Sequence, residues 1–395
     1  MFSSRTQWNM LPNSLSRLVA AKRLRGEDLL DLTESNPTRC GFSYPEKEIL
    51  GGLAHPSSLL YQPDPRGLPL ARKAIAHYYG TLGVAVNPEN IILTASTSEA
   101  YSFLFKLLCN AGEEIIVPQP SYPLLEYLCQ LNDVALRHYR LVYDGEWHID
   151  FEMLQSAMTS RTRAIVLVHP NNPTGSYIKQ NEFERVCAIA AHYHCAVIVD
   201  EVFQPYSLFP DIHRANILAY RSSSLVFSLN GISKLLGLPQ LKLSWIVVSG
   251  HSPYTGESLD RLDIIADTFL SVNTPVQAAM PQLLSSVSQI ESQILERVRQ
   301  NYTVLQKSFM NSHTSVFHVE GGWYAILRLP QMYNDDQWAE KFLLHENIIV
   351  QPGHYYGIEQ KSCIVFSLLP VGDQVADAIK KMHKFIEENS SPIHG

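Results

Sequence analysis

One lysine of this chain stands in a setting that can change its chemistry. Lys234 follows the apolar run Leu225–Leu229 and a short polar segment with a glycine, and apolar residues come directly after it. Burial disfavours the charged form of a lysine and lowers its pKa, so that the neutral amine can form a Schiff base with a carbonyl compound. A surface lysine in a loop is the alternative interpretation of this segment alone.

An acid and an amide follow two other apolar runs. Asp200 closes the run 196–200, where a carboxylate could pair with a cation such as a protonated pyridine nitrogen or a metal ion. Asn172 lies in the turn-rich segment His169–Gly175, directly after Arg163–Val168, and such a turn can aim an amide at a crevice. A helix cap for Asp200 and an ordinary tight turn around Asn172 are the alternatives that remain open.

Three small hydroxyl residues, Ser96, Thr97 and Ser98, stand between the apolar run Ile91–Thr94 and a predicted helix over Glu99–Cys109. A helix N-terminus offers free N–H groups and a positive dipole end, which together can bind a phosphate. Plain N-capping explains the same residues. The chain has neither the GxxxxGK[ST] phosphate loop nor the GxGxxG pattern, which argues against a dinucleotide oxidoreductase.

Short apolar runs alternate with helix-length segments through the middle of the chain, which predicts a three-layer α/β fold with a mostly parallel sheet covered by helices on both faces. In such sheets ligands bind beyond the carboxyl ends of the strands, where the polar residues described above fall. The predicted strands are Ile91–Thr94, Glu114–Val117, Arg163–Val168, Ala196–Asp200, Leu225–Leu229 and Leu243–Val248, and the predicted helices between them include Pro123–Leu131 and Glu182–Tyr193.

The pattern changes near Ser285, where a long polar helix precedes a smaller α+β unit. We therefore expect a large domain over residues 46–290 and a discontinuous small domain from residues 1–45 and 291–395. The start of the chain is placed with the small domain because its helical pattern has no sheet of its own to pack on. The predicted elements of this unit are Ser288–Phe309, Trp323–Leu329, Asp336–His345, Ile348–Val350, Cys363–Leu368 and Gln374–Glu388.

Composition excludes several classes of protein. The chain has 395 residues, of which 46% are hydrophobic and 17% charged, which is typical of a globular protein and not of a disordered one. The net charge of −7 argues against a nucleic-acid or membrane surface, because both partners favour a basic face. No apolar run reaches the roughly 18 residues of a membrane span.

Six cysteines without a CxxC pair favour reduced thiols in the cytoplasm over a disulfide framework. The first 26 residues carry five basic residues and no acid, as a transit peptide would. Because Leu15, Leu18, Val19 and Leu24 fall near helical spacing, we favour a helix of a cytoplasmic protein for this segment.

Taken together, the motifs NNPTG, VDEV and SLNGISK with GLP, in that order, resemble those of fold-type I pyridoxal-phosphate enzymes, in particular class I/II aminotransferases. The resemblance runs from Asn36 to about Pro370. It implies pyridoxal 5'-phosphate as cofactor and transfer of an amino group between an amino acid, or a related amine, and a keto acid. A decarboxylase or a C–N or C–S lyase of the same fold is the alternative, and a non-catalytic paralogue that binds the cofactor is a third.

The resemblance also implies roles for single residues. Lys234 would form the Schiff base and move the proton between Cα and C4′, Asp200 would pair with the pyridinium nitrogen, and Asn172 would bond O3′. Tyr122 would stack on the cofactor ring. Ser96, Thr97, Ser98 and Ser233 would bind its phosphate.

Two further roles follow from the resemblance. Tyr61, in the segment 60–67, would reach the phosphate of a neighbouring subunit, which makes the expected active unit a homodimer. Asn36, in Thr33–Pro37, would lie in a loop over the substrate.

The chain departs from the family pattern around the cofactor in two places. Lys242 stands where the family usually has an arginine on the phosphate, so that a point charge replaces a bidentate fork. Phe203 stands where the family usually has a tyrosine that bonds O3′, so that one donor is lost. Tyr206 is close in sequence and could compensate.

The third departure concerns the substrate. Val365 stands where the family has the arginine that binds the substrate α-carboxylate, and no arginine lies between Arg328 and the C-terminus. The carboxylate is then held otherwise, or the substrate has none. Arg39 and Arg328 are the candidate replacements, although each could equally be an ordinary surface arginine.

Overall fold

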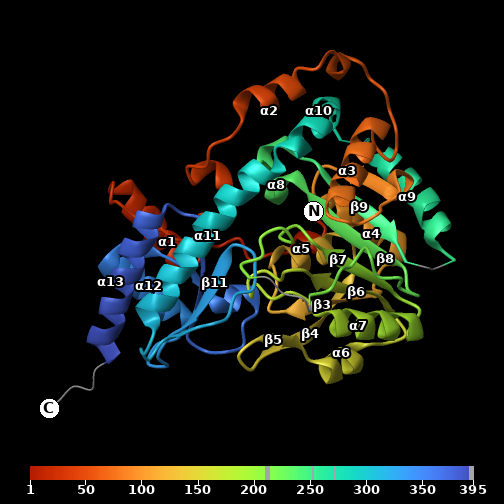
Figure 1. Cartoon of the computed structure of the whole chain (residues 1–395). Helices are drawn as coiled ribbons and strands as arrows, with labels where there is room; N and C mark the ends of the chain where they lie inside the picture. The colour runs from red at the N-terminus through yellow and green to blue at the C-terminus, as the bar shows by residue number, and fades with distance from the viewer. Residues whose placement is uncertain (210–213, 251–252, 271, 391–395) are drawn as a thin grey trace.

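The centre of the molecule is an eight-stranded sheet, as Figure 1 shows. The computed structural model describes residues 1–209, 214–250, 253–270 and 272–390. The strand order is β2-β9-β8-β7-β6-β3-β4-β5. The strands are β2 (Ile91–Thr94), β3 (Glu114–Gln119), β4 (Ala135–Tyr143), β5 (Trp147–Ile149), β6 (Thr162–Val168), β7 (Ala196–Asp200), β8 (Val226–Gly231) and β9 (Ser244–Ser249).

The middle of this sheet is parallel and its margins are antiparallel. β4, β3, β6, β7 and β8 pair in parallel, whereas β9 is antiparallel to both β8 and β2, and β5 is antiparallel to β4. Since β9 reverses direction between them, β2 runs the same way as β8. The carboxyl ends of β2, β3, β6, β7 and β8 therefore lie at one edge, as the sequence predicted.

Helices cover both faces of the sheet, which confirms the three-layer prediction. On one face α4, α5 and α9 pack on Ile115, Val166 and Ile198, and on the other α6 and α7 pack on Ile116, Ile165 and Val197. Side chains alternate between the faces because successive residues of a strand point in opposite directions. These helices are α4 (Thr97–Leu108), α5 (Leu124–Leu131), α6 (Phe151–Ala157), α7 (Gln180–His192) and α9 (Thr255–Phe269).

Four further helices of the described chain lie beside the sheet or next to one of its strands. Ile75 of α3 and Val276 of α10 share one apolar cluster with Leu93 and Trp245 of the sheet. α10 also contacts α2 along its length. The bounds are α2 (Glu46–Leu53), α3 (Pro69–Thr81), the short α8 (Ile232–Leu235) and α10 (Thr274–Ser285), with 3₁₀ turns at Pro56–Leu59, Pro88–Asn90 and Pro239–Leu241.

A smaller antiparallel sheet with the order β10-β11-β14-β13 forms from the last third of the chain. Near the start of the chain, β1 pairs in parallel with β12, so both ends contribute to this part of the molecule. The helix favoured for the N-terminal segment is confirmed as α1, which contacts α12. The elements are α1 (Ser14–Leu24), β1 (Leu30–Asp31), α11 (Val287–Phe309), β10 (Ser315–Val316), β11 (Tyr324–Arg328), α12 (Asp335–Glu346), β12 (Ile348–Ile349), β13 (Gln351–Pro352), β14 (Cys363–Ser367) and α13 (Gly372–Ser390), with 3₁₀ turns at Ser4–Thr6, Pro37–Arg39 and Gly353–Tyr356.

The first residues of the chain contact the end of α5, one of the helices that cover the large sheet. Arg5 forms an ion pair with Asp133, and the indole N–H of Trp8 donates to Gln130 over 2.6 Å. Both partners lie at the end of α5, so this arm departs from the expectation that residues 1–45 all pack with the small unit. The domain boundaries at residues 46 and 290 stay a prediction. None of the described helices is both long and apolar enough to cross a membrane.

Candidate active site

Four of the residues that the sequence singled out lie at or just after the carboxyl edge of the large sheet. Lys234 lies in α8, which follows β8 directly, and Asp200 is the last residue of β7. Tyr122 and Asn172 lie in the loops that follow β3 and β6. Parallel strands bring these loops together because their carboxyl ends meet at the same edge.

Lys234 is half-buried and lies among aromatic rings. Its Nζ lies 4.9 Å from the ring centroid of Trp323 and 5.5 Å from that of Phe203. Burial lowers the pKa of Lys234 to about 8, against a smaller opposite effect from the carboxylate of Asp200. The neutral, nucleophilic fraction of this amine near pH 7 is therefore larger than that of an ordinary lysine, as the sequence predicted for this position.

Asp200 is held by two donors. Its carboxylate accepts a hydrogen bond from the hydroxyl of Tyr101 over 3.2 Å and one from the backbone N–H of Val202 over 3.1 Å. Burial raises the pKa of Asp200 to about 6, and the two donors and Lys234 oppose that rise. A carboxylate in this state can pair with a cation, and a cationic partner would stabilise its ionised form further.

Asn172 and Tyr122 lie in loops that brace each other. The amide of Asn171 donates to the backbone carbonyl of Pro120 over 3.3 Å. The side chain of Asn172 is buried, and its amide oxygen has no hydrogen-bond partner within the described residues. Tyr122 is half-exposed, and burial of its hydroxyl beside Tyr324 and Asp200 raises its pKa to about 12.

The hydroxyl residues at the start of α4 are partly used by the helix itself. The hydroxyl of Ser96 accepts from the N–H of Glu99 over 3.1 Å, and the Glu99 carboxylate accepts from the N–H of Ala95 over 2.6 Å. N-capping, the alternative weighed for Ser96, is therefore present. The N–H groups of Thr97 and Ser98 open the helix and have no partner within it, so they stay available to an anion.

The three remaining cofactor-binding candidates differ in how exposed they are. Ser233 is half-buried beside Lys234 in α8. Lys242 is exposed at the end of the 3₁₀ turn that follows, and Tyr61 is 80% exposed after the turn Pro56–Leu59. The described residues of this one chain do not enclose either side chain.

The N-terminal loop lies against the lysine segment. The hydroxyl of Tyr44 donates to the carbonyl of Gly237 over 2.9 Å. Gly237 has a φ of +58°, and a Cβ at this position would lie 3.1 Å from Pro37. Asn36 directs its amide oxygen to Thr38 and so begins the turn Pro37–Arg39.

The two arginines considered for the substrate carboxylate are both exposed. Arg328 is exposed at the far end of β11, four residues beyond Tyr324, which corresponds to about 13 Å along a strand. Arg39 is largely exposed, and its guanidinium lies 3.7 Å from the carboxylate of Glu34. Val365 is fully buried in an apolar cluster with Ile326, so this position contributes no polar group.

Sequence reasoning missed two residues of the site and misplaced a third. Tyr101 and Trp323 were each read only as parts of an apolar helix or strand, yet they contact Asp200 and Lys234. Tyr206 was considered as a replacement donor for Phe203. Its hydroxyl instead donates to the backbone carbonyl of Lys234 over 2.6 Å.

A cofactor with an aldehyde, a basic ring nitrogen, a ring hydroxyl and a phosphate fits these residues. The buried amide oxygen of Asn172 without a partner marks a place where a ligand would complete the bonding. Lys234 would supply the amine, Asp200 a carboxylate for the ring nitrogen, and the start of α4 the N–H donors for a phosphate. The fold and this donor set are those of a pyridoxal-phosphate enzyme.

Comparison with known proteins gives the family. Residues 45–375 match the model of the aminotransferase class I and II family. The chain is 25% identical over 376 residues to a glutamate-pyruvate aminotransferase, AlaA, of Haemophilus influenzae, with 92% of each chain covered. It is 24% identical over 380 residues to an alanine aminotransferase of Mycobacterium tuberculosis, covering 93% of this chain and 88% of that protein.

Solved structures agree on the fold. An alanine aminotransferase from Pyrococcus furiosus superposes with a TM-score of 0.87 at 24% identity, over 98% of this chain and all of that one. The aspartate aminotransferase of Thermotoga maritima gives a TM-score of 0.84 at 18% identity, over 98% and 100% of the two chains. The chain therefore belongs to the aminotransferase class I and II family. It is a pyridoxal-phosphate-dependent aminotransferase, and the decarboxylase or lyase alternative is not favoured.

Proposed function

We propose that Lys234 is the residue that carries the cofactor and moves the proton during amino-group transfer. The observation that carries this proposal is the position of Lys234 Nζ, packed against Trp323 and Phe203 and close enough to Asp200 for the carboxylate to act on its pKa. An amine with a pKa of about 8 can be neutral when it attacks a carbonyl carbon and can accept a proton afterwards.

The cofactor, when bound, supplies an aldehyde that reacts with amines and a ring that withdraws electrons from the substrate carbon. Asp200 would hold a proton on the ring nitrogen, with Tyr101 and the N–H of Val202 fixing the carboxylate. Asn172 would bond the ring hydroxyl, and Tyr122 would cover the ring face. Thr97, Ser98 and Ser233 would donate to the phosphate, and Lys242 would add a positive charge near it.

We propose an amino acid as the amino donor and a keto acid as the acceptor. The names of the related proteins, glutamate-pyruvate and alanine aminotransferases, make alanine, glutamate and pyruvate the first compounds to test.

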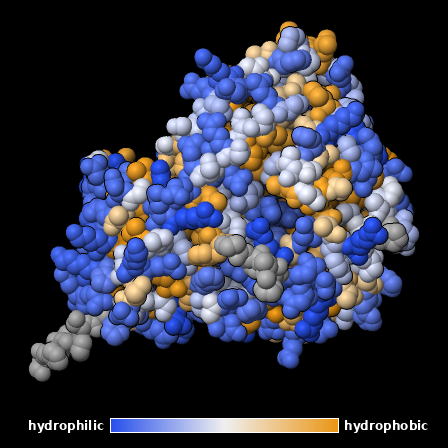
Figure 2. Space-filling model, in the orientation of Figure 1, coloured by the Kyte–Doolittle hydropathy of each residue, from blue (hydrophilic) through white to orange (hydrophobic). Residues whose placement is uncertain are grey.

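We propose a homodimer in which Tyr61 reaches the phosphate of the partner subunit. Tyr61 and the neighbouring side chains Leu50, Leu59, Leu60 and Leu70 are all more than half exposed. Figure 2 shows apolar atoms gathered on the upper part of the molecule, over the region of α10 and α3. An exposed apolar patch of this kind is typical of a protein–protein interface.

The cytoplasm is the proposed location. All six cysteines are free thiols and five of them are buried, which suits a reducing compartment.

Replacement of Lys234 tests the catalytic proposal. The Lys234→Ala protein should show no turnover and no link to the cofactor that borohydride can reduce, whereas Lys381→Ala, a surface lysine paired with Asp377, should behave like the wild type. A yellow, borohydride-reducible chromophore in Lys234→Ala protein would contradict the assignment.

Subunit mixing tests the dimer. If Tyr61 serves the partner's site, hybrids of Lys234→Ala and Tyr61→Ala chains contain one intact site and should regain activity that neither parent has. A monomer in sedimentation, or hybrids no more active than the parents, would contradict the shared site.

A further inference from the structure

We propose that the indole N–H of Trp323 donates the hydrogen bond to the cofactor's ring oxygen that Phe203 cannot supply. This inference rests on the proposed function, because it assumes that Lys234 carries the cofactor. It identifies Trp323 as a positioning residue for the cofactor, a role that the sequence motifs did not indicate.

The first step is the missing donor. Phe203 lies three residues after Asp200 and has a ring without a hydroxyl, 5.5 Å from Lys234 Nζ. Tyr206 cannot replace that hydroxyl, because its own hydroxyl donates to the carbonyl of Lys234 and its ring is fully buried. The ring oxygen would be left with the side-chain amide of Asn172 as its only side-chain partner among the residues assigned above.

The second step is a donor without an acceptor. Trp323 is fully buried, and its Nε1 has no hydrogen-bond partner within the described residues. A buried N–H that stays unpaired costs free energy, and an indole N–H can only donate. The group is therefore suited to an acceptor that a ligand brings.

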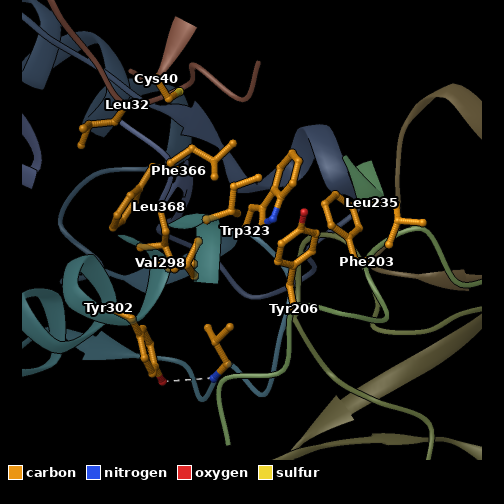
Figure 3. Close-up of a cluster of buried hydrophobic side chains, with 14 of the residues drawn as sticks. Leu32, Cys40, Phe203, Tyr206, Leu235, Val298, Tyr302, Trp323, Phe366 and Leu368 are labelled. Carbon is orange, nitrogen blue, oxygen red and sulfur yellow. Dashed lines mark hydrogen bonds between the residues drawn. The ribbon is translucent and has the colours of Figure 1, made fainter. Parts of the chain in front are cut away.

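The third step is position. The indole of Trp323 stands edge to face with the ring of Phe203, with 5.1 Å between the two ring centroids. Lys234 Nζ lies 4.9 Å from the ring centroid of Trp323. Figure 3 shows Trp323 beside Phe203 and Tyr206, and its ring centroid lies 5.1 Å from that of each. Because the ring oxygen sits on the carbon next to the one that bears the aldehyde, a cofactor joined to Lys234 brings this oxygen into the neighbourhood of Nζ.

Trp147 provides the matched comparison within the same chain. Its Nε1 is also buried without a partner, but its neighbours are Tyr143 and Phe317, in a different apolar cluster. An unpaired indole N–H alone therefore does not identify a ligand site. Proximity to Lys234 and Phe203 is what distinguishes Trp323.

The consequence is a shift in the pH midpoint of the visible spectrum of the bound cofactor. A donor on the ring oxygen stabilises the oxygen as an anion and so favours loss of the proton that the oxygen shares with the neighbouring nitrogen. Loss of that donor in Trp323→Phe should raise the midpoint by about one pH unit, the equivalent of one hydrogen bond. Adding Phe203→Tyr to this variant should return the midpoint toward that of the wild type.

The experiment is a spectral pH titration of the cofactor-loaded wild type, Trp323→Phe, Trp323→Phe with Phe203→Tyr, and Trp147→Phe as the control. An upward shift in Trp323→Phe alone, reversed in the double variant, supports the proposal. An unchanged midpoint in Trp323→Phe, or an equal shift in Trp147→Phe, overturns it.

Phe203→Tyr alone keeps the proposal testable if Trp323→Phe does not fold. With the donor already present, the added hydroxyl should move the midpoint by less than about 0.3 units, while a fall of a full unit would mean that the oxygen had no such donor. Failure of the proposed function is a separate result, because the wild type would then show no pH-dependent visible spectrum and no borohydride-reducible link.

Discussion

The hydroxyl of Tyr206 lies 2.6 Å from the backbone carbonyl oxygen of Lys234 and donates a hydrogen bond to it. This bond ties the loop after β7 to the short helix that carries the lysine. Tyr206→Phe keeps the ring, whose edge-to-face contact with Trp323 has a centroid distance of 5.1 Å, but leaves the carbonyl without this donor. We expect a loss of about 1–3 kcal/mol in the free energy of unfolding, measured by urea denaturation.

The same variant separates positioning from stability. If the bond orients Lys234, the variant should attach the cofactor more slowly even at urea concentrations and temperatures where it is fully folded. Tyr220→Phe is the control, because Tyr220 packs on Phe183 away from the lysine. Attachment at the wild-type rate in Tyr206→Phe would limit this bond to a structural role.

The central strands could be predicted from the sequence because they are buried on both faces. β6, β7 and β8 are continuous apolar runs, and the structure places them within a residue or two of the predicted limits. The hairpin of β4 and β5 was not predicted, since β4 is partly exposed and its charged residues interrupt the apolar pattern. α10 was not predicted either, because it contains Pro281, and a proline is unfavourable inside a helix.

The active-site loops could likewise be located, because each motif follows a strand whose carboxyl end faces the site. The contacts of Tyr101 with Asp200 and of Trp323 with Lys234 could not be predicted in this way. They join segments that are far apart in the chain, and in sequence both aromatic residues look like ordinary core positions. The direction of the Tyr206 hydroxyl also depends on tertiary packing that no local pattern encodes.

The lowered pKa of Lys234 gives the unloaded protein a pH-dependent reactivity. The neutral amine is the nucleophile, and its fraction rises as pH increases through about 8, well below the range of an ordinary lysine. The rate of cofactor attachment should therefore increase about tenfold per pH unit below pH 8 and level off above it. Stopped-flow absorbance after mixing with pyridoxal phosphate measures this rate. A profile that still rises steeply at pH 9 would show that Lys234 is not desolvated.

Tyr101 should matter through Asp200. Tyr101→Phe removes the hydroxyl that donates to the Asp200 carboxylate over 3.2 Å, which raises the pKa of Asp200 further and weakens its pairing with a ring nitrogen. We expect the half-reaction with an amino acid to slow by about tenfold, which corresponds to one hydrogen bond of roughly 1.4 kcal/mol. Bleaching of the visible absorbance in single-turnover experiments measures the effect.

Asp200→Asn is the stronger comparison for the same pairing. It removes the charge altogether and should slow the half-reaction more than Tyr101→Phe does. Equal rates for Tyr101→Phe and the wild type would mean that the N–H of Val202 is sufficient to hold the carboxylate.

Glu201 should make stability depend on pH. It is buried beside Asp200 and bonded by the hydroxyl of Ser228, and burial raises its pKa from 4.5 to about 7. In the unfolded chain the group ionises near pH 4.5, so between pH 4.5 and 7 the folded protein holds a proton that the unfolded chain has lost. Its contribution to stability therefore falls as pH rises through this window, and Glu201→Gln should be more stable than the wild type at pH 8 by about 3 kcal/mol.

Urea denaturation of both proteins at pH 4.5, 6 and 8 checks this expectation. The difference in the free energy of unfolding between the two proteins should be smallest at pH 4.5 and grow toward pH 8. Comparing the two proteins at each pH cancels the effects of the other titrating groups. A constant difference across the three pH values would show that Glu201 titrates at an ordinary pKa.

Arg328 and Arg39 should not bind the substrate carboxylate. Arg328 is exposed and lies about 13 Å along β11 from the end of the strand that adjoins Phe203. The guanidinium of Arg39 lies 3.7 Å from the carboxylate of Glu34, which partly neutralises its charge. An arginine that clamps a buried carboxylate normally contributes several kcal/mol, so its removal would raise KM by more than 100-fold. We expect Arg328→Ala and Arg39→Ala to change KM for alanine or glutamate by less than threefold, and a 100-fold rise for either variant would restore that arginine to the site.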